Sequence, residues 1–185
     1  MQGLRLPPVP RIHLYLDIDG VLNAEARALH RRAESPWPGG YNVPAPYYGA
    51  TIALDAVFAL NRLIARYRIV GHWLTTWGPG APQFGDYITL AGSDRWPVLA
   101  TEDVSHSEEW QKFTSIRAHL AITRPDITIW IDDHLDRERE AREWAEAAGI
   151  LAVAPDPEWG IEPRHIDLLE RHIAHRLAEL RPDIT

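Results

Sequence analysis

The chain has 185 residues, 45% of them hydrophobic, which suits one globular domain with a sizeable core and lies far from the composition of disordered proteins. Its formal net charge of −7 argues against a protein that grips nucleic-acid backbone through bulk charge, although a local arginine cluster could still bind phosphate. The chain has no cysteine, which excludes disulfides, thiolate metal sites and thiol nucleophiles.

The start of the chain, MQGLRLPPVPR, lacks the apolar core of a signal peptide, and no apolar run approaches the length of a membrane span. We therefore expect a cytoplasmic protein without membrane association. Residues 1–185 are interpreted as a single domain, and the sequence leaves its oligomeric state open.

The first predicted elements are a strand, a long loop and a helix. Residues 12–17, IHLYLD, form an apolar run that predicts a short buried strand ending in an acid. Residues 24–50 are dense in Pro and Gly and predict a long irregular segment, which is usually functional or disordered inside a compact domain. Apolar residues recur on one helical face over residues 52–67, with Thr51 as the expected N-cap.

The middle of the chain predicts two strands and another helix. The segment RIVGHWLTTWG, residues 68–78, is interpreted as a strand that ends in threonines, and PVLA, residues 97–100, as a short third strand. Residues 107–122 predict a helix with Ser107 as its N-cap and acids in its first turn.

The last third alternates strands with helices. The apolar run ITIWI (127–131) and the segment ILAVA (150–154) predict two more strands, separated by a charged surface helix and followed by a helix over 163–179. Alternation of this kind implies crossover connections and a mainly parallel sheet of five strands with helices on both faces. The predicted fold class is therefore α/β.

Acids and threonines follow three of the predicted strands, namely Asp17 with Asp19, Thr75, and Asp132 with Asp133. Because ligands bind beyond the carboxyl ends of parallel strands, these residues are expected to converge. Paired carboxylates repel each other unless a cation lies between them, and oxygen ligands on short loops suit Mg²⁺. The expected ligands are Asp17 and Asp133, with the main-chain carbonyl of Asp19.

The same residues suit phosphoryl transfer, which needs positioning and charge neutralisation. Asp17 is expected to attack phosphorus as the nucleophile, while Asp19 acts first as acid and then as base. Thr75 would donate a hydrogen bond, and Gly20 would let the chain turn tightly beneath the phosphate. Lys112 is the single lysine beside 18 arginines, which favours a point-charge role at phosphate for its compact ammonium.

Four segments carry a resemblance to a known family: DIDGVLN, the strand ending in LTT, the isolated Lys112 ahead of a strand, and IWIDDHLD. They resemble, in order, the four motifs of the haloacid dehalogenase (HAD) superfamily, over residues 12 to about 155. The chain is similar, more narrowly, to capless HAD domains of RNA-repair proteins and phage, which share a late GI before the last helix, as in EWGIEPRHIDLLERHI.

This resemblance implies a Rossmann-like three-layer sandwich and a role for each matching residue. The implied roles are nucleophile for Asp17, acid and base for Asp19, phosphate binders for Thr75 and Lys112, metal ligand for Asp133, second acid near the metal for Asp132, and a residue orienting Lys112 or the motif for Asp136. Thr76 replaces Thr75 if the strand ends one residue later. The two adjacent acids leave open which of them touches the metal.

No large cap domain is expected, since neither gap between the motifs obviously houses one. Residues 24–50 are interpreted as a loop or a small lid over a comparatively open site. By analogy with the family, open sites go with large substrates such as phosphorylated protein or nucleic-acid ends.

The first functional hypothesis is a Mg²⁺-dependent phosphomonoester hydrolase that works through an aspartyl-phosphate on a nucleotide or a nucleic-acid end. The alternative is a HAD-like module that binds phosphate or nucleic-acid ends with little catalytic activity. Phosphotransfer or dehalogenation is a third hypothesis, and Asp19 argues against dehalogenation because that reaction has no phosphate leaving group to protonate.

Some residues have interpretations outside the expected site. The 24–50 segment begins with a basic cluster that is interpreted as a solvated helical turn, namely Arg27, His30, Arg31 and Arg32. Its aromatic residues are interpreted as pinning the loop to the body of the domain, namely Trp37, Tyr41, Tyr47 and Tyr48. Trp77 and Trp96 are candidates to line the pocket mouth. His13, His72, His134 and His165 show no zinc spacing and are interpreted as structural or incidental.

Overall fold

The computed structural model describes residues 9–25, 31–43, 50–99 and 110–180 and contains a four-stranded parallel sheet. Its strands lie in the order β4 (Val70–Trp73), β1 (Ile12–Leu16), β5 (Ile127–Ile131) and β6 (Leu151–Val153). Each successive pair is parallel, so all four carboxyl ends lie at one edge of the sheet. The predicted α/β class is confirmed.

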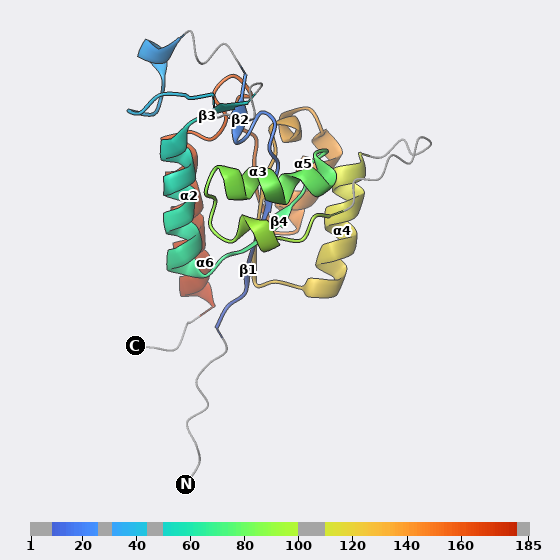
Figure 1. Ribbon diagram of the computed structural model, residues 1–185. Helices are drawn as coiled ribbons and strands as arrows, with labels where there is room; N and C mark the ends of the chain where they lie inside the picture. Colours follow the sequence, from blue (N-terminus) through green and yellow to red (C-terminus); the bar gives the residue numbers. More distant parts are fainter. Residues whose placement is uncertain (1–8, 26–30, 44–49, 100–109, 181–185) are drawn as a thin grey trace.

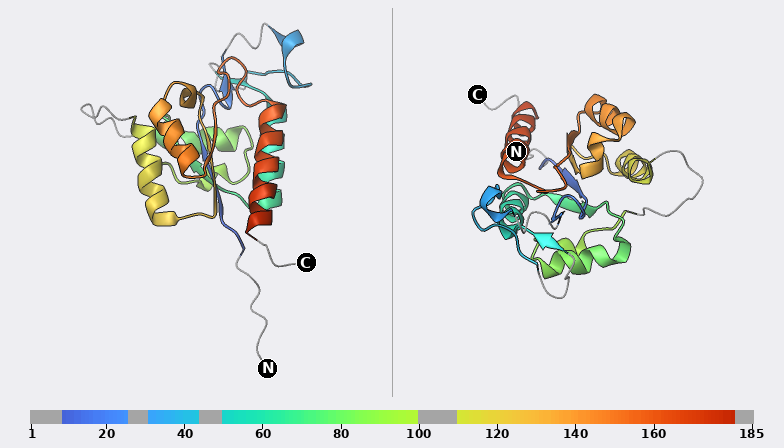
Figure 2. Two further views of the ribbon diagram at one scale, coloured as in Figure 1. Left: turned by 180° about the vertical axis from the view of Figure 1, so that it is seen from behind. Right: turned by 90° about the horizontal axis from the view of Figure 1, so that it is seen from above.

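Five α-helices surround the sheet in the described part of the chain: α2 (Leu54–Tyr67), α3 (Ala81–Tyr87), α4 (Gln111–Thr123), α5 (Arg139–Ala147) and α6 (Pro163–Glu179). Helices α2 and α6 cover one face, α4 and α5 cover the other, and α3 lies beyond the β4 edge (Figures 1 and 2). None of the helices in the described residues has both the length and the apolarity needed to cross a membrane. The predicted Ser107 cap lies outside the described residues.

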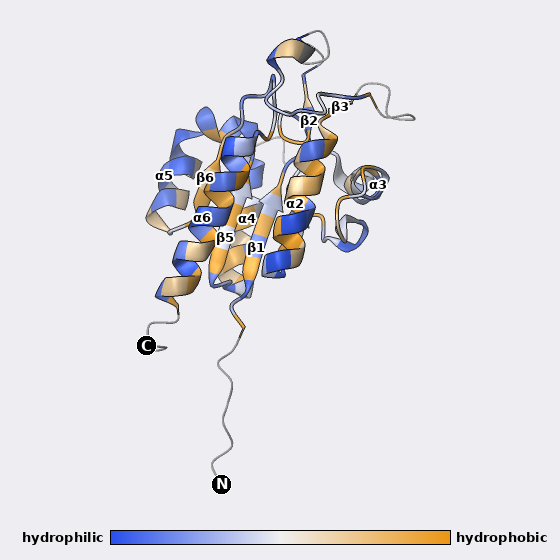
Figure 3. Cartoon of the chain, turned by 90° about the vertical axis from the view of Figure 1, so that its left-hand side faces the viewer, coloured by the Kyte–Doolittle hydropathy of each residue, from blue (hydrophilic) through white to orange (hydrophobic). Residues whose placement is uncertain are grey.

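The strands are buried on both faces, and their alternating side chains form two cores. Ile12, Leu14 and Leu16 of β1 pack on the α2 and α6 side, whereas Tyr15 packs with Trp130 of β5 on the α4 and α5 side. Figure 3 shows the apolar strands between helices whose outer faces are hydrophilic. This two-sided burial explains why the strands read as continuous apolar runs in the sequence.

The outer edge of β4 is covered by residues 97–99, part of the segment that was predicted to be the short third strand. The backbone N–H of Trp73 donates to Pro97 and the N–H of Leu99 donates to Trp73, both at 2.9 Å, and a single parallel bridge joins Trp73 to Val98. The indole of Trp96 packs against Trp73, with ring centroids 5.1 Å apart, rather than at the pocket mouth. The sheet therefore has four strands, and the extra pairing protects its edge.

Two short strands, paired as a small hairpin, lie at the two ends of the 24–50 segment. Strands β2 (Asn23–Ala24) and β3 (Thr51–Ile52) pair antiparallel, and the side-chain oxygen of Asn23 accepts a hydrogen bond of 2.7 Å from the N–H of Thr51. Thr51 is thus part of a strand, and Ala53 is the residue that caps α2 without a side-chain hydrogen bond. The expected Thr51 cap was wrong because Thr51 belongs to this pairing and the helix begins at Leu54, two residues later than expected.

Three imidazoles gather between the sheet and α4, which the sequence did not indicate. His13 of β1 and His72 of β4 are buried, and a hydrogen bond of 3.1 Å links Nδ1 of His13 with Nε2 of His72. His119 of α4 completes the cluster, with its ring centroid 4.6 Å from that of His72. Burial lowers the pKa of His13 to about 4 and that of His72 to about 3, and it also lowers the pKa of His119.

These shifts predict that acid destabilises the fold. An imidazole with a depressed pKa binds fewer protons in the folded chain than in the unfolded chain, so stability is full above the ordinary pKa near 6.5 and falls as the pH drops toward 4. We expect a loss on the order of a few kcal/mol over that window, measured by urea unfolding.

The matched variant is His72→Gln. Buried aspartates titrate equally in both proteins, so the difference between wild type and His72→Gln isolates the imidazole contribution. The variant should show a flatter dependence on pH below 6.5. Parallel pH profiles would contradict the prediction.

Candidate active site

The carboxyl ends of the strands bring acids from distant parts of the chain together. The hydrogen-bond ladder continues one residue past the strands, since the N–H of Asp17 donates to Ile131 at 3.1 Å and the N–H of Asp132 donates to Val153 at 3.1 Å. On the other side of β1, the N–H of Leu74 donates to Leu16 at 3.0 Å. These bonds fix Asp17, Asp132 and the residues after Leu74 at one edge.

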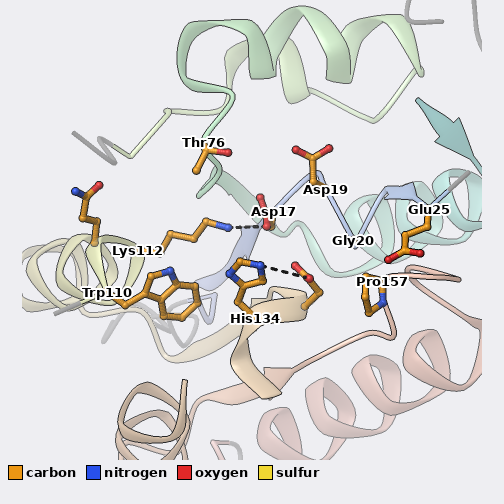
Figure 4. Close-up of a pocket in the computed structure, with 11 residues that line it drawn as sticks. Asp17, Asp19, Gly20, Glu25, Thr76, Trp110, Lys112, His134 and Pro157 are labelled. Atoms are coloured by element: carbon orange, nitrogen blue, oxygen red, sulfur yellow. Dashed lines mark hydrogen bonds and ion pairs between the residues drawn. The ribbon is translucent and has the colours of Figure 1, made fainter. Parts of the chain in front are cut away.

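A cavity of about 510 Å³ opens above this edge (Figure 4). Its walls come from every element that ends there and from the 156–161 loop. The lining residues are Asp17, Asp19, Gly20, Glu25, Thr76, Trp110, Gln111, Lys112, Asp133, His134 and Pro157. Six of the residues expected from the sequence therefore converge: Asp17, Asp19, Gly20, Thr76, Lys112 and Asp133.

Lys112 crosses the floor of the cavity from the first turn of α4. Its Nζ donates to Asp17 at 2.5 Å and to Asp132 at 2.7 Å, and the residue is 5% exposed. Burial alone would lower the pKa of Lys112, but the charges of Asp17 and Asp132 outweigh it and raise the pKa, which keeps the ammonium protonated. A cation at a helix N-terminus is disfavoured by the helix dipole, so these two carboxylates hold it there.

Asp132 and Asp133 point in different directions. Asp132 is fully buried, and its other carboxylate oxygen accepts a hydrogen bond of 3.0 Å from the N–H of His134. Burial and the neighbouring Asp17 charge raise the pKa of Asp132 to about 7. Asp133 faces the cavity, 3.7 Å from Nε2 of His134, and burial raises its pKa as well.

Gly20 makes room for Asp133. Its φ of +69° lies in the left-handed region, and a Cβ built on it would lie 2.5 Å from Cγ of Asp133. A side chain at this position would therefore be strained and would also displace the carboxylate. The glycine that follows the two acids of the motif thus permits the approach of a third acid.

Asp19 is held above the cavity by two residues that the sequence did not identify as its partners. Its Oδ2 accepts a hydrogen bond of 2.7 Å from the indole of Trp77, and its Oδ1 accepts one of 2.7 Å from the amide of Asn23. Asn23 also joins the β2–β3 hairpin through Thr51. The base of the 24–50 segment is therefore connected directly to Asp19.

The two threonines after β4 have different surroundings. Thr76 is exposed and lines the cavity, whereas Thr75 is fully buried and its hydroxyl lies 3.4 Å from the backbone N–H of Trp77. The geometry favours Thr76 over Thr75 for contact with a phosphate in the cavity.

The resemblance implied that Asp136 orients Lys112 or the motif, but the side chain of Asp136 does not lie beside Lys112. Its side chain is 77% exposed and pairs with Arg142 at 3.3 Å. The 3₁₀ turn Asp133–Asp136 carries this residue outward, and Asp132 makes the contact with Lys112 instead.

The carboxylates of Asp17, Asp132 and Asp133 fit a divalent cation. One oxygen from each lies within 4.8 Å of the others. When all three are ionised, the single ammonium of Lys112 leaves an excess of two negative charges around them. The donors are all oxygen, which suits a hard cation such as Mg²⁺.

The described part of the 24–50 segment is fixed against the 156–161 loop next to the cavity. The indole of Trp37 donates to Ile161 at 2.7 Å, and the hydroxyl of Tyr41 donates to Trp159 at 2.5 Å. Arg31 pairs with Glu158 at 2.6 Å. The prediction that aromatic residues pin this loop is confirmed for Trp37 and Tyr41, while Arg27, His30, Tyr47, Tyr48 and the side chain of Arg32 lie outside the described residues.

Comparison with known proteins assigns most of the chain to a family. The family model described as "HAD domain in Swiss Army Knife RNA repair proteins" matches residues 13–166. This span begins in β1 and ends inside α6, so it includes every residue that lines the cavity. No curated protein and no solved structure matches the chain.

Proposed function

Because the chain belongs to the family of HAD domains found in Swiss Army Knife RNA repair proteins, which implies a phosphohydrolase, we propose that it is a Mg²⁺-dependent phosphomonoesterase for nucleic-acid ends. The observation that carries the proposal is the Lys112 ammonium held against Asp17 on the floor of an open, acid-lined cavity (Figure 4). A nucleophilic carboxylate and a cation for phosphoryl oxygens are thereby adjacent.

In the first step Asp17 attacks the phosphorus of the monoester. A bond forms between a carboxylate oxygen of Asp17 and phosphorus, while the bond between phosphorus and the leaving oxygen breaks. Asp19, oriented by Trp77 and Asn23, gives that leaving oxygen a proton. The alcohol leaves, and the phosphoryl group remains on Asp17.

In the second step water replaces Asp17 on phosphorus. Asp19 is now a carboxylate and takes a proton from the water as its oxygen attacks, which regenerates the Asp17 carboxylate and releases inorganic phosphate. The roles of Asp19 in the two steps are opposite, so one residue returns to its starting state in each cycle.

The remaining cavity residues position the phosphate. Lys112 neutralises phosphoryl oxygens, and the hydroxyl of Thr76 donates a hydrogen bond to one of them. Asp17 and Asp133 would hold Mg²⁺ with the carbonyl of Asp19, while Asp132 orients Lys112. The bound Mg²⁺ would supply further neutralisation of the phosphoryl charge.

The walls of the cavity favour a nucleic-acid end as the substrate. Trp110 and His134 line one side, and the indole of Trp110 is stacked on Trp130 with ring centroids 5.2 Å apart. An aromatic wall held in this way can stack on a nucleobase next to the phosphate. Within the described residues, the two gaps between the motifs hold a small hairpin and the short helix α3 in place of a cap domain, which leaves room for a polymer.

Phosphate release from matched oligonucleotides tests the proposal. The panel contains RNA and DNA with 3′- or 5′-phosphates and the corresponding free nucleotides, each with Mg²⁺ or EDTA. We expect Mg²⁺-dependent release that is faster from oligonucleotide ends than from free nucleotides. Faster release from nucleotides would contradict the assignment of the substrate, and no release together with measurable oligonucleotide binding would favour the binding module instead.

The two threonines provide a second test. Thr76→Val removes the hydroxyl that faces the cavity and is expected to lower kcat/KM by about 10- to 100-fold, which corresponds to one hydrogen bond to a charged group. Thr75→Val alters a buried hydroxyl and should lower the unfolding midpoint with a smaller effect on kcat/KM. Steady-state kinetics and urea unfolding of both variants give the comparison. The reverse ranking in kcat/KM would assign the phosphate contact to Thr75.

A further inference from the structure

A second group of potential metal ligands lies away from the acidic cavity. One ring nitrogen from each of His13, His72 and His119 lies within 4.8 Å of the others. His13 precedes Asp17 by four residues on β1, which corresponds to about 13 Å along an extended strand. The histidine cluster is therefore separate from the three aspartates.

One ring nitrogen of the cluster is buried without a polar partner in the described part of the chain. Nδ1 of His72 is buried and has no hydrogen-bond partner among the residues that the structure describes. Nδ1 of His13 and Nε2 of His72 form a hydrogen bond of 3.1 Å with each other, which an ion bound by this pair would replace. The neutral imidazole is the form that binds metal.

Tyr15 orients the rings. Its hydroxyl lies 2.8 Å from Nδ1 of His119, and its ring stacks on His72 with centroids 4.9 Å apart and an angle of 16° between the planes. Hydrogen bonds to the second nitrogen of a ligating imidazole are the usual means of fixing its direction. The cluster is thus held by its surroundings before any ion binds.

We propose that His13, His72 and His119 form a zinc site between the sheet and α4. Imidazole is a ligand that suits Zn²⁺, and bonds of 2.0–2.1 Å place two nitrogens of a tetrahedral site about 3.3 Å apart. The pair from His13 and His72 already has nearly this spacing. His119, the least buried of the three, supplies the third nitrogen.

Such a site would join the elements that carry the acidic cavity. His13 lies on β1, which ends at Asp17, and His72 lies on β4, which leads to Thr76. His119 lies on α4, seven residues after Lys112, so it lies two helical turns further along the same helix. Zinc would therefore fix α4 to the two strands and restrain Lys112 relative to Asp17.

Metal titration of the full chain tests the proposal without any activity measurement. With Mg²⁺ in excess to occupy the aspartates, Zn²⁺ should bind at one equivalent and raise the unfolding temperature. Co²⁺ in its place should give the strong visible absorption of tetrahedral nitrogen coordination. His119→Gln should lower the affinity for both ions by about 10-fold or more, since a ligand is lost.

Two control variants test whether the metal binds at the three histidines rather than elsewhere. His175→Gln changes an exposed histidine of α6 and should leave the titration unchanged. Asp133→Asn alters the acidic cavity and should also leave the Co²⁺ absorption unchanged. The proposal is overturned if wild type shows no Zn²⁺-dependent stabilisation, or if His119→Gln folds and binds both ions as wild type does.

Discussion

Asp17→Asn is expected to lower phosphate release by about 10⁴-fold or more while the fold is retained. The amide has nearly the shape of the carboxylate but cannot act as the nucleophile. Lys112 keeps its second partner, because Asp132 lies 2.7 Å from Nζ. Stopped phosphate-release assays on the best oligonucleotide substrate, together with urea unfolding, measure both parts of this prediction.

The covalent step gives a more direct readout of the same variant. Acid quenching during turnover should trap a phosphoryl adduct on wild type that hydroxylamine removes, and Asp17→Asn should show no adduct. Asp94→Asn changes an exposed aspartate that pairs with Arg95 and serves as the matched control, with activity and adduct unchanged. An active Asp17→Asn enzyme, or an adduct on another residue, would contradict the assignment of the nucleophile.

The sequence predicts the positions of the acids because parallel strands are simple to recognise. The apolar runs at 12–17 and 127–131 are buried on both faces, and the residues that follow them must lie at one edge. Lys112 was singled out because it is the single lysine of the chain, and it lies on the floor of the cavity. Placing the acids at one edge requires only the direction of the strands in the sheet.

Contacts that depend on register and on loop geometry were not predicted. Asp132, rather than Asp136, meets Lys112 because a 3₁₀ turn after β5 carries Asp136 into solvent. Asn23 and Trp77 meet Asp19 because two separate turns approach each other above the sheet. Local sequence patterns carry no information about these approaches.

The histidine cluster also depends on strand register and was therefore not predicted from the sequence. His13 and His72 are 59 residues apart and meet only because β1 and β4 pair with Tyr15 opposite His72. His119 joins them from a helix that packs over that face. Zinc motifs in sequences are recognised by short spacings, so a site assembled by strand register gives no such signal.

Lys112→Met should combine loss of activity with a large loss of stability. The substitution keeps the apolar stem but leaves Asp17 and Asp132 buried without their cation. Removing one partner of a buried ion pair costs about 3–5 kcal/mol. Because 1 kcal/mol corresponds to about 2–4 °C for a domain of this size, thermal unfolding should detect the change easily.

The dependence of stability on pH and on Mg²⁺ distinguishes the loss of a buried charge from a simple packing defect. Without the ammonium the buried carboxyl of Asp132 takes up a proton more readily than in the unfolded chain, so the deficit should shrink as the pH falls and grow above pH 7. Mg²⁺ should stabilise Lys112→Met more than wild type, since Asp17, a proposed Mg²⁺ ligand, no longer shares its charge with the ammonium. Adding Asp132→Asn should restore part of the stability but none of the activity, because one buried charge is removed while the phosphate still lacks its lysine. A deficit that ignores pH, Mg²⁺ and the second substitution would mean that Lys112 contributes packing rather than charge.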